Sequence, residues 1–220
     1  MITLLFDLDG TLTDPRQGIV ESIRHALLTM GVESPPDDRL ERYIGPPLAD
    51  TFAELLPDPS ATSIGEAIAH YRERFGDRGW RENRVYPGVP DLLDASKARG
   101  WRCVLATSKP TVYAERIVRH FRLRPFLDAV YGSELDGRLG TKTELIAHIV
   151  RTEPLETQRS VMVGDRRHDV EGALANGIPT VGVSYGYGSR EELDAAGARW
   201  LCDEPAAVIG TLETHFALET

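Results

Sequence analysis

Residues 7–14 read Asp7-Leu8-Asp9-Gly10-Thr11-Leu12-Thr13-Asp14 and follow directly on the apolar run 2–6, which predicts a buried strand. Two acids at the end of a buried strand are costly unless they line a polar site, because uncompensated buried charge is unfavourable. Side-chain alternation along extended backbone predicts Asp7 and Asp9 on one side. Gly10 allows a sharp turn, and Asp14-Pro15 predicts a helix N-cap followed by a proline at the first helical position. The stretch therefore indicates a strand, an acidic turn and a helix.

An isolated Asp-x-Asp-Gly leaves two other interpretations open. The acids could simply cap a turn, as they do in many Asp-rich loops. They could also begin a calcium loop of the EF-hand kind, which needs further ligands and a glutamate at the loop's end. Thr11, Thr13 and the residues that follow do not supply that series. The rest of the chain has to decide between a turn and a site.

A second polar cluster lies at the end of another apolar run. Residues 102–106 predict a strand that leads into Thr107-Ser108-Lys109, and Pro110 then opens a helix. Small hydroxyls at the end of a strand and beside a helix N-terminus can hold a phosphate through side-chain and backbone donors. This cluster is therefore a candidate phosphate site.

Two more clusters follow. Lys142 lies in the first turn of an amphipathic helix that Thr141 and Glu144 open with capping-box spacing. A cation there opposes the helix dipole, so this lysine is better accommodated if it faces an anion. The short apolar strand 160–163 runs into Gly164-Asp165-Arg166-Arg167-His168-Asp169, a second acidic cluster at a strand end.

Taken together and in this order, the four clusters resemble the motifs of the haloacid dehalogenase-like (HAD) hydrolase superfamily. Those motifs are a nucleophilic Asp-x-Asp-Gly-Thr, a Thr or Ser, a Lys, and Gly-Asp-x-x-x-Asp, and all four are present. The resemblance covers nearly the whole chain. Within the superfamily the chain is similar to the phosphoglycolate phosphatase and 5′-nucleotidase group, through residues 9–14, 44–48, 106–110 and 185–189.

Composition is consistent with a metabolic enzyme. The chain of 220 residues is long enough for one core domain and a modest insertion. Its net charge of −9 disfavours nucleic acid and anionic membrane as partners. With no long apolar run and no leader pattern, a cytoplasmic location is expected. Cys103 and Cys202 are far apart and in no paired spacing, which indicates neither a zinc site nor a redox motif.

The pattern of elements predicts an α/β fold, a Rossmann-like doubly wound parallel sheet with an inserted all-helical cap domain. Residues 16–81 contain helical stretches and no convincing strand, and they are assigned to the cap. Residues 1–15 and 82–220 are assigned to the core. Helices are expected at 89–99, 111–120, 142–152, 169–176 and 190–196, and strands at 102–106, 128–131, 160–163 and 178–183. Ligands in such sheets lie beyond the carboxyl ends of the strands, where every candidate residue is found.

The resemblance implies phosphoryl transfer by Asp7 and Asp9. Asp7 would attack phosphorus in line and form an aspartyl-phosphate, which splits hydrolysis into two easier steps. Asp9 would protonate the departing alkoxide and then deprotonate the water that breaks the intermediate. Mg²⁺ suits an all-oxygen site made of Asp7, the backbone carbonyl of Asp9, Asp165, waters and a phosphate oxygen. By the same resemblance, Asp169 acts behind these ligands, on a metal-bound water or on Lys142, and direct ligation of the metal stays open. A helix-start acid favoured by the helix dipole is the other interpretation of Asp169.

Thr107 and Lys142 complete the expected catalytic set. Thr107, Ser108 and the backbone donors around them would hold the remaining phosphate oxygens with Lys142. Lys109 is a further candidate for the substrate entrance, although nothing in the sequence sets its direction. The run 185–188 could border the pocket, or could simply deliver Ser189 and Glu192 as a capping box. Arg166 and Arg167 could meet a substrate, although arginines on the solvated surface are commoner, and His168 is interpreted as an exposed or helix-face residue.

Substrate choice is expected to reside in the cap, because the core motifs bind only metal and the transferring phosphoryl group. Gly45 and Pro46, with Pro47, form the best candidate for a loop that reaches the leaving group, because prolines beside a glycine make a rigid, shaped turn. Tyr43 and Arg16 are neighbouring candidates. A plain turn between helices is the other interpretation of this loop.

The leading hypothesis is a Mg-dependent phosphomonoesterase, monomeric or homodimeric, acting on a small cytosolic metabolite such as a 5′-nucleotide or 2-phosphoglycolate. A sugar phosphomutase on the same scaffold is the alternative, and it would move phosphate between positions of one sugar. A carbon–halogen hydrolase is disfavoured, because that branch lacks the acid found here at Asp9. A non-catalytic binding module would not require all of Asp7, Asp9, Thr107, Lys142 and Asp165.

Overall fold

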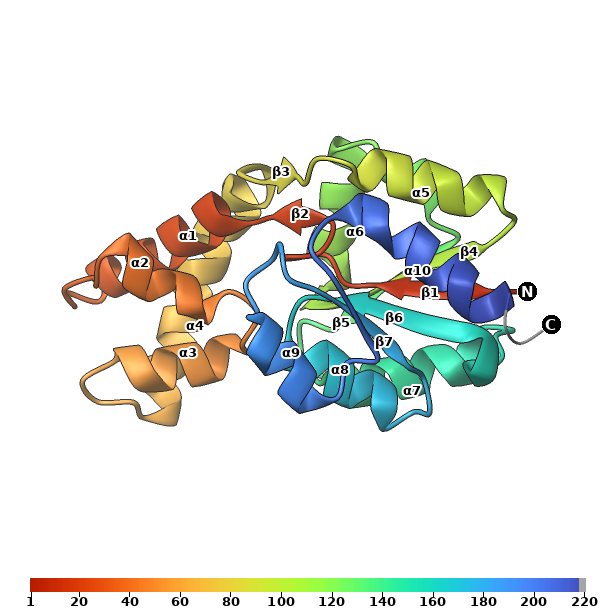
Figure 1. The fold of residues 1–220 in the computed structure, drawn as a ribbon. Coiled ribbons are helices and arrows are strands. Elements are labelled where there is room, and N and C mark those ends of the chain that lie inside the picture. Colours follow the sequence, from red (N-terminus) through yellow and green to blue (C-terminus); the bar gives the residue numbers. More distant parts are fainter. Residues whose placement is uncertain (218–220) are drawn as a thin grey trace. The chain divides into compact units, whose positions relative to one another are not determined.

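The computed structural model describes residues 1–217 and divides the chain into two compact units (Figure 1). The first, the core unit, contains residues 1–14 and the chain from Val85 onward. The second, the helical unit, contains Pro15–Arg84. The boundaries predicted from the sequence were 15/16 and 81/82, which differ from these by one and by three residues.

The core unit is built on a six-stranded sheet with the order β5-β4-β1-β6-β7-β8. Every pairing in it is parallel, which confirms the predicted α/β class. The central strand β1 (Thr3–Phe6) is fully buried between β4 (Arg102–Pro110) and β6 (Ser160–Gly164). The outer strands are β5 (Ala129–Ser133), β7 (Thr180–Val183) and β8 (Trp200–Cys202).

Helices cover both faces of the sheet (Figure 1). From β1 the chain moves outward to β4 and β5, and then returns past β1 to β6, β7 and β8. Because parallel strand connections are right-handed, this reversal puts the connecting helices on opposite faces. One face carries α5 (Val89–Ala98), α6 (Thr111–His120) and α10 (Pro205–Ala217), and the other carries α7 (Lys142–Thr152), α8 (Arg167–Leu174) and α9 (Arg190–Ala196). The 3₁₀ turns η3 (Arg124–Phe126) and η4 (Thr157–Arg159) precede β5 and β6.

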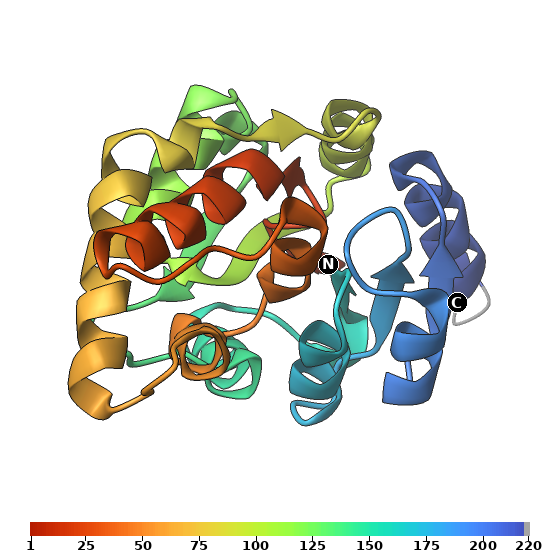
Figure 2. The same ribbon diagram turned by 90° about the vertical axis from the view of Figure 1, so that its left-hand side faces the viewer.

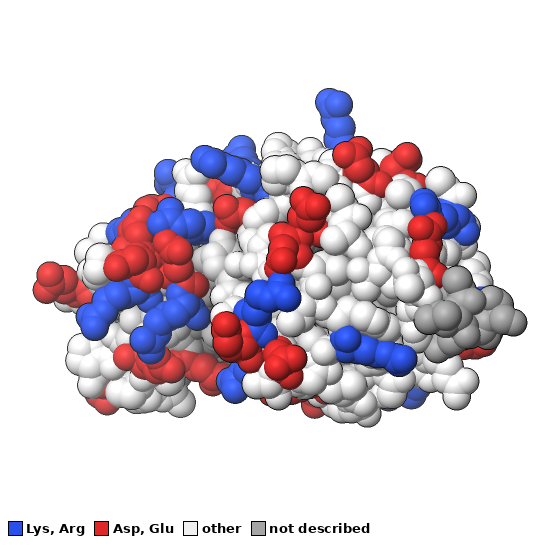
Figure 3. Space-filling view, viewed as in Figure 1, with Lys and Arg blue, Asp and Glu red and all other residues white. Residues whose placement is uncertain are grey.

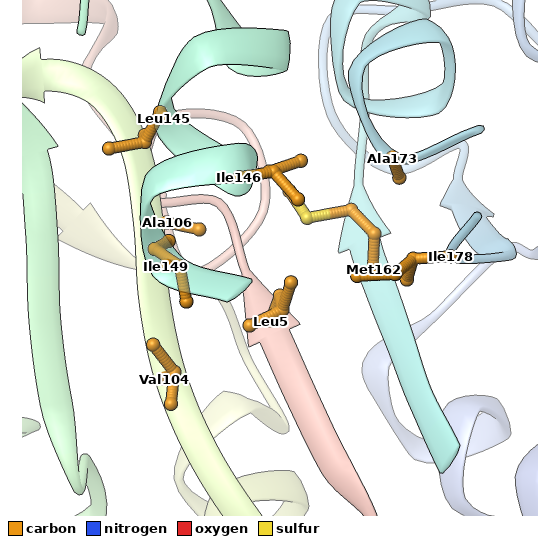
Figure 4. Close-up of a cluster of buried hydrophobic side chains, with 9 residues drawn as sticks. All are labelled: Leu5, Val104, Ala106, Leu145, Ile146, Ile149, Met162, Ala173 and Ile178. Atoms are coloured by element: carbon orange, nitrogen blue, oxygen red, sulfur yellow. The ribbon is translucent and has the colours of Figure 1, made fainter. Parts of the chain in front are cut away.

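One cluster of the hydrophobic core lies between the central strands and the α7–α8 face (Figure 4). Helix α7 contributes a buried stripe at the i, i+1 and i+4 positions of one face, which is the spacing of an amphipathic helix. The side chains of this cluster are all fully buried: Leu5, Val104, Ala106, Leu145, Ile146, Ile149, Met162, Ala173 and Ile178. The cluster joins β1, β4 and β6 to helices α7 and α8.

Two local expectations were wrong. The strand predicted to end at 106 continues to Pro110, because β4 resumes pairing with β5 at Ser133 after a shift of register. Asp14 does not cap a helix: it belongs to β2 (Thr13–Asp14), which pairs with β3 (Arg84–Val85), and the N-cap of the next helix is Pro15. The Asp14 carboxylate instead accepts a hydrogen bond from the Tyr187 hydroxyl.

All regular structure between residues 16 and 81 is helical, as expected. The helices are α1 (Arg16–Thr29), α2 (Asp37–Leu40), α3 (Leu48–Leu55) and α4 (Ala61–Asp77), with 3₁₀ turns η1 (Glu41–Tyr43) and η2 (Gly79–Arg81). Helices α1 and α4 pack against each other (Figure 2). An aromatic row of Phe52, Tyr71 and Phe75 forms the centre of this unit, with the last two rings stacked at 5.5 Å.

Acidic and basic side chains intermingle over the face shown in Figure 3. Throughout residues 1–217, no helix has both the length and the apolar character needed to cross a membrane.

Candidate active site

Three neighbouring strands bring the predicted residues to one edge of the sheet. The register pairs Phe6 with Leu105 on one side and with Val163 on the other, so Asp7 lies level with Gly164, the last residue of β6, and with Ala106, where the first stretch of β4–β5 pairing ends. The Asp7 N–H donates to the Val163 carbonyl at 3.0 Å, which continues the ladder by one bond. This edge is also where the strand order reverses, the usual ligand position in open α/β sheets.

Carboxylates from two of these strand ends converge. Oxygens of Asp7, Asp165 and Asp169 all lie within 4.8 Å of one another, and all three residues are buried. Burial raises the pKa of Asp165 well above its ordinary value, and the nearby carboxylates of Asp169 and Asp7 raise it further. Burial also raises the pKa of Asp169. Three oxygen ligands in a setting that disfavours their negative charge make a good fit for a hard divalent cation.

Lys142 neutralises part of this charge. Its ammonium donates to Asp7 Oδ1 at 2.7 Å and to the Ala106 carbonyl at 2.6 Å, and it lies 2.6 Å from Asp169 Oδ1. Burial by itself lowers the pKa of Lys142, but the carboxylates of Asp169 and Asp7 outweigh that effect and the pKa is raised. The lysine therefore stays charged in the first turn of α7, because it faces anions there.

Asp169 serves two partners at once. Its Oδ2 accepts the Arg166 N–H at 3.1 Å and so helps to begin α8, while Oδ1 faces Lys142. The sequence indicated both a helix-start role and a supporting role. The tertiary structure additionally brings its carboxylate among the three that converge.

Asp9 has a different partner. Its Oδ2 lies 2.7 Å from the ammonium of Lys109, with 12% and 6% of the two side chains exposed. Burial raises the pKa of Asp9, and the Lys109 charge opposes that shift. The other oxygen, Oδ1, is buried and meets no hydrogen-bond donor within residues 1–217. The predicted metal contact of Asp9 is through its backbone carbonyl, and that contact stays a prediction.

The hydroxyl cluster lies on β4 where pairing with β5 is interrupted, between Ala106 and Pro110. Thr107 is buried, and its Oγ1 accepts the Lys109 N–H at 3.3 Å. The Ser108 carbonyl accepts the Ser133 hydroxyl at 2.7 Å. The roles of Thr107 and Ser108 as phosphate ligands stay predictions.

The two hydrogen-bond donors that hold the Asp165 carboxylate were not predicted from the sequence. Thr11 Oγ1 donates to Asp165 Oδ1 at 3.2 Å, and the Tyr187 N–H donates to Oδ2 at 2.8 Å. Glycines bring the backbone this close: a Cβ at Gly10 would stand 2.1 Å from Asp165 Oδ2, and one at Gly186 2.5 Å from the same atom. The signal was visible in the aromatic and glycine run 185–188, which borders the site.

The other interpretation of residues 185–188, that they simply deliver Ser189 and Glu192 as a capping box, is half right. Ser189 Oγ does accept the Glu192 N–H at 3.1 Å and caps α9. The Glu192 carboxylate, however, binds elsewhere, accepting from Arg166 Nε at 3.0 Å and from the Arg167 N–H at 2.9 Å. Arg166 therefore contacts Asp169 through its backbone N–H and Glu192 through its side chain.

The remaining predicted residues belong to the helical unit. Gly45, with a φ of +106°, turns the chain between η1 and α3, and Pro46 follows it. Arg16 Nε donates to Glu41 Oε1 at 2.7 Å, and the Tyr43 hydroxyl donates to Glu54 at 3.1 Å. Their contribution to substrate binding stays a prediction.

Comparison with known proteins places this geometry in a family. Residues 4–183 match the family described as haloacid dehalogenase-like hydrolase. A 5′-nucleotidase of Pseudomonas aeruginosa is 47% identical over 212 residues, which cover 96% of each chain. The tyrosine-protein kinase PtkA of Mycobacterium tuberculosis is 42% identical over 192 residues, 87% of this chain and 65% of that protein.

More distant similarity extends to a plasmid-encoded phosphoglycolate phosphatase of Cupriavidus necator, 29% identical over 93% of this chain and 90% of that protein. A crystal structure of a predicted phosphatase from Clostridium acetobutylicum superposes with a TM-score of 0.91 at 39% identity, covering 96% of this chain and 97% of that one. The chain therefore belongs to the HAD-like hydrolase family, and it is an enzyme of the phosphatase class within it. The resemblance drawn from the four motifs is confirmed.

Proposed function

We propose that the protein is a Mg²⁺-dependent phosphomonoesterase that acts on a small phosphorylated metabolite of the cytosol through an aspartyl-phosphate on Asp7. One observation supports this most strongly: Asp7, at the end of the central strand, is held by Lys142 at 2.7 Å inside a group of three buried carboxylates. A nucleophilic carboxylate needs a fixed direction and a counter-charge for the phosphoryl group, and this arrangement supplies both.

The chain's own residues account for both chemical steps. An Asp7 oxygen attacks phosphorus while Asp9, protonated, gives its proton to the leaving oxygen as the P–O bond breaks. Asp9 then takes a proton from the water that attacks the aspartyl-phosphate, which releases inorganic phosphate and restores the Asp7 carboxylate. Thr107, Ser108 and Lys142 hold the oxygens that do not react.

The carboxylates of Asp7 and Asp165, with the Asp9 backbone carbonyl, are the proposed ligands of the Mg²⁺ ion. When bound, the ion would neutralise phosphate charge and fix the orientation of the ester. Asp169 is proposed to act from behind, through its ion pair with Lys142. Thr11 and the Tyr187 N–H hold Asp165 in place, as outer-shell donors commonly do for metal-binding carboxylates.

Two substrates are proposed for the first assays, a 5′-nucleotide and 2-phosphoglycolate. The similarity to a protein named 5′-nucleotidase, at 47% identity over 96% of both chains, puts 5′-nucleotides first. The more distant similarity to a phosphoglycolate phosphatase supports the second choice.

The test is release of inorganic phosphate from a panel of 5′-nucleotides, 2-phosphoglycolate and sugar phosphates, with Mg²⁺ and after exhaustive chelation. We expect release that requires Mg²⁺ and is lost in Asp7→Asn. Full activity after chelation would refute the metal requirement. Migration of phosphate between positions of a sugar, with little net release, would favour the phosphomutase instead.

A further inference from the structure

We infer that Lys109 is a positioning residue for Asp9: it holds one carboxylate oxygen so that the other is presented to the oxygen that leaves phosphorus. This inference rests on the proposed function, because it assigns Lys109 to the proton transfer of that reaction. It differs from the sequence-based expectation that Lys109 lines the substrate entrance.

The two oxygens of Asp9 are in unlike situations. Oδ2 lies 2.7 Å from the Lys109 ammonium, whereas Oδ1 is buried and meets no donor within residues 1–217. A buried oxygen without a hydrogen-bond partner is destabilising, so such atoms in native proteins call for an explanation. A leaving-group oxygen, to which the Asp9 carboxyl group donates its proton, would supply the partner that Oδ1 lacks.

Lys109 is itself well fixed. It lies on β4, and its N–H donates to Thr107 Oγ1 at 3.3 Å. The next residue is Pro110, whose ring fixes its own φ and so restrains the backbone that follows Lys109. Only 6% of its side chain is exposed, so the ammonium has little freedom to turn away from Asp9. A long side chain with both ends restrained is suited to orienting a carboxylate.

The two buried lysines of the core unit, Lys109 and Lys142, form ion pairs with different carboxylates. Lys142 contacts Asp7 at 2.7 Å and Asp169 at 2.6 Å, and Lys109 contacts Asp9 at 2.7 Å. If Lys109 only added positive charge for the phosphoryl group, its loss would impair every phosphate ester to the same degree. If it orients Asp9, its loss impairs the esters whose leaving oxygen needs a proton.

The experiment compares kcat/KM of wild type and Lys109→Met for 4-nitrophenyl phosphate and for the best alkyl phosphate of the substrate panel. This constant reports the steps up to release of the leaving group. We expect a fall of roughly 30–100-fold for the alkyl ester, the size of effect that misplacing a reacting group produces. The activated aryl ester, whose leaving group needs no proton, should fall by less than about 3-fold.

Three further variants make the result specific. Lys97→Met removes a lysine with a similar pairing, 2.8 Å from Asp128, and should change neither constant. Lys109→Arg keeps the positive charge and should retain more of the alkyl-ester activity than Lys109→Met. In the Asp9→Asn background, Lys109→Met should cost the alkyl ester almost nothing more, because its partner is already disabled.

Equal losses on the two esters, or full additivity with Asp9→Asn, would overturn the inference. Failure of the proposed function looks different: wild type releases no phosphate, or Asp9→Asn shows no preference for activated esters. If Lys109→Met does not fold, as judged by thermal unfolding, Lys109→Gln replaces it with the same expected outcome.

Discussion

Asp7 is the residue on which the proposed chemistry depends most directly. Its carboxylate is fixed by Lys142 at 2.7 Å and is the member of the acidic group that follows the central strand. We expect Asp7→Asn to lower phosphate release by at least about 10³-fold, because an amide of the same shape is not nucleophilic. The measurement is phosphate release beside thermal unfolding. Ordinary turnover in a well-folded variant would rule out the aspartyl-phosphate route.

Gly186 is a residue whose lack of a side chain matters for the metal site. A Cβ there would lie 2.3 Å from the Gly10 carbonyl and 2.5 Å from Asp165 Oδ2. We expect Gly186→Ala to displace Asp165 and to weaken Mg²⁺ binding by about 10–100-fold, as the loss of outer-shell support does in other metal sites. Calorimetric titration with Mg²⁺ measures this directly.

Gly210→Ala is the matched control for that variant. An added Cβ at Gly210, within α10, meets nothing within 4 Å, and alanine is the better helix former by about 1 kcal/mol. Its Mg²⁺ affinity should equal that of wild type. Unchanged affinity in Gly186→Ala as well would mean that the glycines do not shape the metal site.

Among the elements, the start of β4, strand β5 and the end of α7 meet at one half-buried carboxylate. Glu153, the C-cap of α7, accepts from Arg102 of β4 at 2.6 Å and from the Tyr131 hydroxyl of β5 at 2.6 Å. The hydrogen bond from Arg102, followed by that from Tyr131, lowers the pKa of Glu153 below its ordinary 4.5. These contacts tie three elements together at the sheet end opposite the acidic site.

The sign of the pH dependence follows from that lowered pKa. The unfolded chain protonates Glu153 before the folded protein does, so this stabilisation is complete above about pH 4.5 and is lost as pH falls through the folded pKa. We expect Glu153→Gln to reduce the free energy of unfolding at pH 7 by about 1.5–3 kcal/mol. The difference from wild type should shrink in acid, as measured by urea unfolding across pH 3–7. A difference that is constant with pH, or one equalled by the exposed control Glu171→Gln, would contradict this.

At the scale of the whole molecule, the two units divide the proposed tasks. The groups proposed to act on the phosphoryl group all belong to the core unit, so discrimination between leaving groups is assigned to the helical unit. Binding energy from the remote part of a substrate positions it for attack, and therefore affects its turnover as well as its affinity.

We expect replacement of Pro46 and Pro47 by alanine to loosen the turn after Gly45 and reduce discrimination among natural phosphate esters. The ratio of kcat/KM for the best natural ester to that for 4-nitrophenyl phosphate should fall about 10-fold, since the aryl ester asks little of this loop. Replacing Pro57 and Pro59, exposed prolines between α3 and α4, is the matched control and should leave the ratio alone. An unchanged ratio in the first variant would place selectivity elsewhere.

The amino-acid sequence by itself determined the class of fold and the order of the principal elements. Helices α6, α7 and α9 have the limits that were expected, 111–120, 142–152 and 190–196, and β6 begins at 160 as expected. Such elements are predictable because the apolar period, the caps and the flanking polar residues are all local. The same local patterns, taken in order, were enough to indicate the family.

Only the tertiary structure decided how the polar side chains are paired. Lys109 could have pointed in any direction, and its pairing with Asp9 depends on β4 and β1 being neighbours in the sheet. The carboxylate of Asp169 lies close to that of Asp7 because β6 is also a neighbour of β1. Asp14 is not the helix cap that was expected, because β2 pairs with β3. A strand of two residues is too short to show a side-chain period. Contacts such as Lys142 with Asp7, which lie 135 residues apart in the sequence, leave no local signal. The packing of distant elements therefore set the partners, while the sequence of each element set its type.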